Sequence, residues 1–247
     1  MNNTLVNGLQ LLELLVYSDK PLGVSAMAAR LGLGKSNVHR LLQGLVELRY
    51  VSREDEGRSY AATLKVWELG NALGGRMDVR QAARASMEKL MQKTRETIHL
   101  SVLDGAEIVY LHKIDSPEPV RAYSEIGGRA PAHCVATGKA LLAWQPEEVI
   151  AGLSTHLSRH SPNTIVDARD FAREMRKVRE SGHAVNRGEW RDSVWGVAAP
   201  IRGARGDIVA AIGVSGPAER IRQGPVKRFA ADVMEAAEAI SAELRKG

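Results

Sequence analysis

The most constraining feature of the sequence is a pair of short helical segments separated by a glycine turn. Two helices that cross nearly at right angles need a small residue at the crossing, a glycine in the turn and apolar anchors under the second helix. Ala28 supplies the small residue, and Gly32 supplies the turn four residues later. Val38 and Leu41 follow as anchors, at further offsets of six and three residues. The spacing predicts a helix-turn-helix whose second helix covers 35–48.

The segments around this pair complete a small domain. Apolar residues at helical spacing predict another helix in front of the pair, and residues around a polar tip predict two short strands behind it. The expected elements are a helix over 4–17, a short helix over 25–31 with Ser25 as its N-cap, and strands over 50–52 and 59–61. The strand pair is interpreted as a wing, and we assign residues 1–64 to a winged helix-turn-helix domain.

The remainder of the chain changes from helical to strand periodicity. We expect a helix over 65–73 within a linker over 65–77, and a second domain over 78–247 that begins with an Asp78–Gln81 capping box. Its expected strands cover 97–103, 107–114, 120–124, 194–201 and 208–215, and its expected helices run through Lys139 and Leu142, over 167–181 and over 226–244. Helices flanking hairpin-linked strands indicate an α+β domain with an antiparallel sheet. We expect the last helix to pack within its own domain.

The second helix of the pair has a polar face opposite its buried one. Every side chain on that face can hydrogen-bond, and such a set suits the major groove, where Asn, Gln and Arg read base edges while Ser and Lys hold phosphates. Arginines of the wing can reach backbone phosphate or the minor groove. The predicted DNA contacts are Ser25, Lys35, Ser36, Asn37, His39, Arg40, Gln43, Arg53 and Arg58. The alternative for the helix is an ordinary solvated polar face.

Charge and composition agree with a DNA-binding protein. The 247-residue chain has a net charge of +5, and eight basic against four acidic residues leave +4 of it between positions 20 and 65. A single cysteine, Cys134, excludes an intramolecular disulfide and a multi-cysteine zinc site, and fits a reducing compartment. No segment approaches the ~18 apolar residues of a membrane span, and the N-terminus lacks signal-peptide features. We expect a cytoplasmic protein without membrane contact.

A series of motifs runs along the chain in a fixed order. They cover residues 9–15, 34–42, 58–60, 68–70, 132–143 (AHCVATGKALLA), 198–201 (AAPI) and 214–217 (VSGP). In this order they resemble the IclR family of bacterial regulators over nearly the whole chain. The resemblance implies a winged helix joined by a helical linker to a GAF-like (profilin-like) effector domain. It also implies homodimers, in some members tetramers built as dimers of dimers, that bind a double-stranded DNA operator and respond to small organic or aromatic acids.

The resemblance also implies where the effector binds. In members that bind small keto acids, the pocket uses residues matching Ala136, Thr137 and Ser215. It also uses an acidic residue, a cysteine and a serine at positions that here hold Asn186, Gly196 and Gly213. These three departures remove a carboxylate, a thiol and a hydroxyl. We therefore expect a roomier pocket with fewer side-chain hydrogen bonds, suited to a larger organic or aromatic acid.

Other residues complete the predicted effector site. Arg129 and His133 are candidates to bind the acid group, since an arginine can offer a carboxylate two parallel hydrogen bonds. Tyr123, Trp190 and Trp195 are candidate apolar walls, although each can equally be plain core. The predicted effector contacts are Ala122, Tyr123, Arg129, His133, Ala136, Thr137, Asn186, Trp195, Gly196, Gly213 and Ser215.

Three other functions were weighed against a ligand-responsive regulator. An enzyme with Cys134 as nucleophile and His133 as base is disfavoured, because neighbours in sequence usually point apart. A metal site among His99, His112, His133, His156, His160 and His183 lacks a ligand spacing such as paired cysteines. An architectural DNA-binding or interaction protein would not need the large second domain. No GxGxxG or P-loop follows a predicted strand, so we expect no cofactor.

Overall fold

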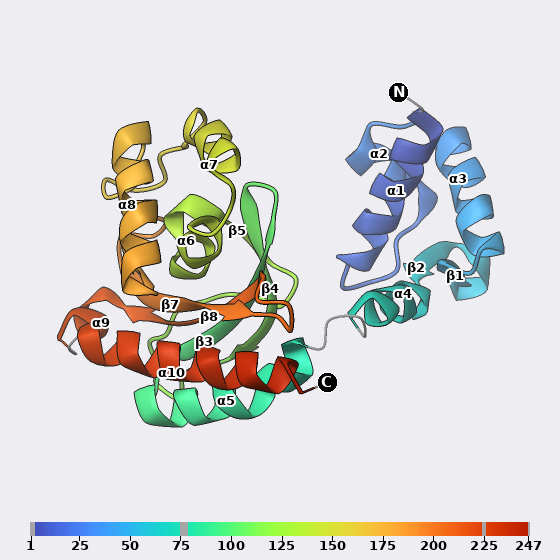
Figure 1. The fold of residues 1–247 in the computed structure, drawn as a ribbon. Coiled ribbons are helices and arrows are strands. Elements are labelled where there is room, and N and C mark those ends of the chain that lie inside the picture. The colour runs from blue at the N-terminus through green and yellow to red at the C-terminus, as the bar shows by residue number, and fades with distance from the viewer. Residues whose placement is uncertain (1–2, 75–78, 224–225, 247) are drawn as a thin grey trace. The chain divides into compact units, whose positions relative to one another are not determined.

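The computed structural model describes residues 3–74, 79–223 and 226–246, and the chain divides into two compact units, 1–77 and 78–247 (Figure 1). Among the described residues, no helix is long and apolar enough to cross a membrane. Each unit has its own buried apolar core. The expected capping residue Asp78 lies outside the described residues.

The first unit is a helix-turn-helix followed by a two-stranded wing. Its elements are α1 (Asn3–Val16), α2 (Val24–Leu31), α3 (Lys35–Glu47), β1 (Val51–Glu54), β2 (Ser59–Ala62) and α4 (Lys65–Gly74). Gly32 ends α2 with a φ of 65°, a left-handed conformation that favours glycine, and its N–H donates to the carbonyl of Ala28. Ala28, Val38 and Leu41 are buried in the core of this unit. The predicted helix-turn-helix is therefore confirmed.

One detail of this unit was predicted wrongly. Ser25 is not the N-cap of α2, because the helix begins one residue earlier and Gly23 holds the N-cap position in an extended conformation. The reason lies in the preceding residue: Leu22 forms a two-way backbone bridge with Tyr60 of β2, which fixes the chain direction just before Gly23. Ser25 is left exposed in the first turn of α2.

The second unit is built on a six-stranded antiparallel sheet in the order β5-β4-β3-β8-β7-β6. The strands are β3 (Thr97–Asp104), β4 (Glu107–Ile114), β5 (Arg129–Pro131), β6 (Ala184–Arg187), β7 (Val194–Arg202) and β8 (Ile208–Pro217). The central pairing joins β3 to β8, with His99 opposite Gly213 and Thr97 opposite Ser215. The α+β class with an antiparallel sheet is confirmed.

Helices cover both faces of this sheet (Figure 1). On one face, α5 (Val79–Thr94) and α10 (Val226–Leu244) lie side by side, and α10 contacts β7 and β8. Packing of the last helix within its own domain is thereby confirmed. On the other face, α6 (Ala136–Leu142) packs against β3, β7 and β8 and is itself contacted by α8 (Ala168–Ser181). Short helices α7 (Glu147–Ser154) and α9 (Ala218–Gln223), and strands β5 and β6, were not anticipated.

Residues 120–124 form no strand, contrary to prediction. The strand that pairs with the outer edge of β4 is β5, at residues 107–109. The segment is held to the sheet by side chains instead. The Ser124 hydroxyl lies 2.7 Å from Nε2 of His99, and Nζ of Lys113 donates to the Ser124 carbonyl at 2.8 Å. This course brings the segment to the cavity described below.

Candidate functional site

The polar face of α3 is exposed to solvent, as the sequence predicts. Lys35, Ser36, His39, Arg40 and Gln43 are exposed, and Asn37 is half-buried. The opposite face of the helix is buried in the core of the unit. Nη2 of Arg40 donates to Oδ1 of Asn37 at 3.4 Å, so the two side chains most suited to base edges lie next to each other.

Three further predicted DNA contacts lie elsewhere in the same unit. Arg53 stands on β1 opposite Tyr60, and Arg58 follows the short 3-10 turn that forms the tip of the wing. Both arginines are exposed, as is Ser25 on α2. A wing with exposed basic side chains has the chemistry to contact phosphates beside a helix in the major groove.

A pocket that opens to solvent, called the cavity below, lies in the second unit between α6, the sheet and the 120–124 segment. Eight of the eleven predicted effector contacts line it: Ala122, Tyr123, Ala136, Thr137, Asn186, Gly196, Gly213 and Ser215. They come from five separate parts of the chain, so only the fold brings them together. The other lining residues are His99, Tyr110, Val135, Trp190, Arg191, Val194 and Val214.

A buried histidine lies at the floor of this cavity. Nε2 of His99 lies 2.7 Å from the Ser124 hydroxyl and Nδ1 lies 3.1 Å from the Ser215 hydroxyl. Burial, assisted by the charge of Lys113, lowers the pKa of His99 to about 4. His99 is therefore neutral near pH 7. It can exchange hydrogen bonds with a ligand there, but it supplies no positive charge.

The charge at the cavity comes from Arg191. Its guanidinium is exposed and lies 4.6 Å from the ring centre of Trp190, which also lines the cavity. No acidic group among the described residues lies within ion-pairing distance of it. Burial raises the pKa of Tyr110 to about 12, and the Arg191 charge opposes that rise. The guanidinium is thus close enough to act on a phenol inside the cavity.

The wall formed by Asn186 is supported by a buried ionic cluster. Oδ1 of Asn186 accepts the N–H of Glu189 at 2.8 Å, and its Nδ2 donates to the Val194 carbonyl at 3.4 Å. Glu189 and Glu174 both bind Nζ of Lys139, at 2.8 and 2.9 Å, and the Lys139 side chain is fully buried. An amide suits position 186 because it must donate and accept at once.

The pKa values of the two glutamates in this cluster are shifted in opposite directions. Burial raises the pKa of Glu189, and Lys139 offsets only part of that rise. Burial would also raise the pKa of Glu174, but the Lys139 ammonium outweighs it and holds that pKa below its ordinary value. Lys139 therefore has one firmly ionised partner. Its charge keeps the Asn186–Glu189 turn in place beside the cavity.

Three predicted effector contacts do not line the cavity. Arg129 is exposed and bound to Asp104 and Glu107, at 2.5 and 2.7 Å. His133 bonds to the Ser158 carbonyl. Trp195 faces away because successive residues of a strand point to opposite faces, and its neighbour Gly196 faces the cavity. That alternation is visible in the sequence and was the signal that could have excluded Trp195.

The expected gain of room from two glycines is also wrong. A Cβ at Gly213 would lie 2.9 Å from Cγ2 of Thr137, and one at Gly196 would lie 2.9 Å from the Val214 carbonyl oxygen. At Gly213 this space is taken by Thr137 of α6 and Ala198 of β7, and at Gly196 it is taken by the backbone of β8. The glycines permit that packing rather than enlarge the cavity.

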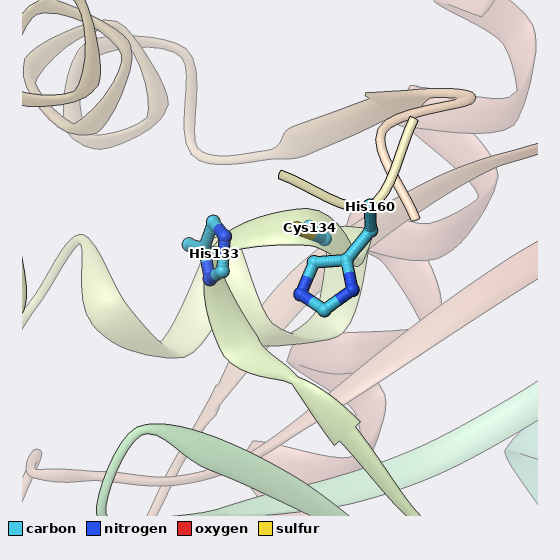
Figure 2. A group of neighbouring side chains, drawn as sticks. All are labelled: His133, Cys134 and His160. Atoms are coloured by element: carbon cyan, nitrogen blue, oxygen red, sulfur yellow. The ribbon is translucent and has the colours of Figure 1, made fainter. Parts of the chain in front are cut away.

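The geometry around Cys134 does not support a nucleophile. Its side chain is fully buried, and burial, with the nearby Glu189 charge, raises the pKa of the thiol to about 12. Nε2 of His133 is engaged with Ser158 at 3.0 Å. His133, Cys134 and His160 nevertheless form a group of metal-ligating side chains, with ligand atoms within 4.8 Å of one another (Figure 2).

Comparison with known proteins decides the family. The model of the IclR helix-turn-helix domain matches residues 4–55, and that of the IclR C-terminal domain matches residues 72–242. The chain belongs to the IclR family. It is 33% identical to the regulator KdgR of Escherichia coli (strain K12) over 228 residues, which cover 92% of this chain and 87% of KdgR.

Solved structures of the family have the same fold. The IclR protein of Thermotoga maritima superposes with a TM-score of 0.83 at 29% identity, covering 99% of this chain and all of the other. An IclR homologue of Microbacterium hydrocarbonoxydans, crystallised with 4-hydroxybenzoate, gives 0.86 at 26% identity, with 99% and 100% covered. This IclR-family chain is therefore a DNA-binding transcriptional regulator rather than an enzyme.

Proposed function

We propose that an organic acid with an aromatic ring binds the cavity of the second unit and thereby alters the affinity of the regulator for its DNA operator. The observation that carries this proposal is the cavity lining. Aromatic side chains (Tyr110, Tyr123 and Trp190), neutral hydrogen-bonding groups and the Arg191 guanidinium all line this one pocket. Ligand sites combine an apolar lining with a few placed polar groups in this way.

Two features favour an aromatic acid over a small keto acid. The cavity retains the hydroxyl of Ser215 but has glycine at 196 and 213 and an internally bonded amide at 186, so few side chains remain to hold a compact polar ligand. Arg191 lies at an exposed position, where a carboxylate can pair with it while a ring lies deeper. The relative that was crystallised with 4-hydroxybenzoate supports the same class of ligand.

On the DNA side, we propose that the α3 face reads the operator in the major groove and that Arg53 and Arg58 of the wing contact its backbone. Support comes from the exposure of these side chains in one unit with the helix-turn-helix. Arg129 and His133 are no longer proposed for the effector, because their side chains are engaged outside the cavity.

We further propose that the regulator is a homodimer joined through its first unit. That unit leaves large apolar side chains exposed on α1 and α4: Leu5, Leu9, Val16, Trp67 and Leu69. A soluble monomer rarely leaves many large apolar groups together in water, and a second copy is the simplest cover. Sedimentation of the full chain is expected to give a dimer, with Trp67→Glu shifting it toward monomer. A wild-type monomer at micromolar concentration would refute this interface.

Calorimetric titration of the full chain with 4-hydroxybenzoate tests the effector proposal. Wild type is expected to bind it, and Arg191→Gln to bind it at least about tenfold more weakly, since losing one charge-assisted pair costs about 1.5–3 kcal/mol. The matched control is Arg187→Gln, an exposed arginine that does not line the cavity. Equal affinity of all three proteins would refute the role of Arg191. Absence of binding by wild type to this and other aromatic acids would refute the ligand class.

A further inference from the structure

We propose that His133, Cys134 and His160 form a binding site for a divalent metal ion of the zinc type. Two imidazole nitrogens and one thiol sulfur from two segments of the chain lie within 4.8 Å of one another (Figure 2). Imidazole and thiolate are ligands that Zn²⁺ prefers in proteins. The Cys134 thiol is neutral in the metal-free chain, so binding of the ion would displace its proton to solvent. The three residues line no part of the effector cavity, so this would be a separate site.

The segments that carry the ligands are firmly held. His133 and Cys134 lie in the buried 3-10 turn Ala132–Cys134, between β5 and α6. The loop that carries His160 is organised by Thr164. Its hydroxyl accepts the N–H groups of His160 and Ser161, at 3.0 and 2.8 Å, and donates to the Glu189 carbonyl at 2.6 Å. The backbone of the ligand set is therefore in place before any ion binds.

The His133 ring has the orientation found in metal-binding histidines. Its Nε2 lies 3.0 Å from the carbonyl oxygen of Ser158, and only a protonated nitrogen can donate to that acceptor. The bond fixes the tautomer and leaves Nδ1 with a free lone pair. Histidine ligands almost always donate their other ring N–H to a carbonyl or carboxylate in this manner.

His160 is the ligand that would close the site. Around a tetrahedral zinc ion, sulfur and nitrogen ligands lie about 3.3–3.6 Å apart, so the widest separation must shrink by about 1 Å. His133 and Cys134 are buried, whereas His160 is exposed and can rotate about its side-chain bonds. Both histidines also line a hollow that opens to solvent, together with Glu107 and His156, which leaves room for water as a fourth ligand.

Cobalt substitution tests this site directly. The full chain is stripped of metal with a chelator, titrated with Co²⁺, and followed by absorption; Zn²⁺ is then added in competition. Wild type is expected to develop a thiolate-to-cobalt charge-transfer band that saturates at equimolar Co²⁺ and disappears with Zn²⁺. Cys134→Ala should lack the band, and His160→Ala should weaken Zn²⁺ binding about tenfold or more.

The controls separate a built site from surface binding and from misfolding. His183→Ala removes a half-buried histidine outside the group and is expected to bind Co²⁺ as wild type does. His160 is exposed, so His160→Ala should melt at the wild-type temperature without metal, and Zn²⁺ should stabilise it less than it stabilises wild type or His183→Ala. No charge-transfer band in wild type, or equal losses in the His160 and His183 variants, would overturn the proposal.

Discussion

The polar face of α3 and the polar lining of the cavity differ in how the chain supplies them. The α3 residues lie within nine positions of one another, and all but one are exposed. The cavity residues come from separate strands, loops and a helix, and several are buried and hydrogen-bonded to each other. The first set can therefore change without disturbing its unit, whereas the second is part of what holds its unit together.

The largest effect is expected on the stability of the chain, from a substitution among the buried residues beside the cavity. Lys139→Ala leaves Glu174 and Glu189 close together without their shared cation. Removing one partner of a buried ionic cluster costs about 3–5 kcal/mol of unfolding free energy. Urea denaturation measures it, with Lys177→Ala on the surface of α8 as the control. A loss below about 1 kcal/mol would mean that the cluster does not support the cavity wall.

The next largest effect is the pH dependence of stability that the buried His99 causes. The pKa of His99 is about 4 in the folded chain against 6.5 in the unfolded chain, so the unfolded chain binds more protons between these values. Stability from this group is complete above pH 6.5 and falls as pH drops toward 4, by about 3 kcal/mol in all. Denaturation curves of wild type and His99→Gln over this range should diverge. Parallel curves would contradict a neutral buried His99.

On the exposed side, Arg40→Ala should weaken operator binding about tenfold to a hundredfold, because one well-placed base contact is worth about 1–3 kcal/mol. Its unfolding free energy should change by less than about 0.5 kcal/mol. Mobility shift at fixed salt, on DNA selected from a random duplex pool by wild type, measures the first quantity. Arg245→Ala, in the turn after α10, is the control. Unchanged affinity of the Arg40 variant would remove α3 as the reading element.

The smallest effect is expected at the wing. Arg53→Ala should weaken binding only a few-fold, equally on selected and random DNA, and lower the slope of affinity against salt by about one. The slopes of wild type and of the variant are measured in the same mobility-shift assay at several salt concentrations. A loss confined to the selected sequence would instead assign Arg53 to base recognition.

The same contrast explains what could be predicted from the sequence. Ala28, Gly32, Val38 and Leu41 specify the helix-turn-helix through local spacing alone, and the structure confirms it. The hairpin at 97–114 and the capped helix ending at Gly182 are local as well, and they form as predicted. Only the Ser25 cap failed there, because a long-range bridge between Leu22 and Tyr60 sets the start of α2.

Features that depend on contacts between distant segments could not be predicted from local sequence patterns. Residues 120–124 look like a strand in the sequence, but side-chain contacts with distant residues hold them instead, such as the bond between His99 and Ser124. The family resemblance indicated much of the cavity lining. It did not reveal His99 or Arg191, since neither stands in a motif and each reaches the cavity only through the fold.

If the proposed regulation is correct, an acid bound in the cavity changes how tightly the α3 face binds DNA. This coupling is measured as the operator affinity of the full wild-type chain without and with saturating 4-hydroxybenzoate. We expect a change of about 5- to 150-fold, the usual range for coupled sites, and a smaller change for Arg191→Gln at the same acid concentration. If the acid binds the protein but leaves its operator affinity unchanged, the cavity does not regulate DNA binding.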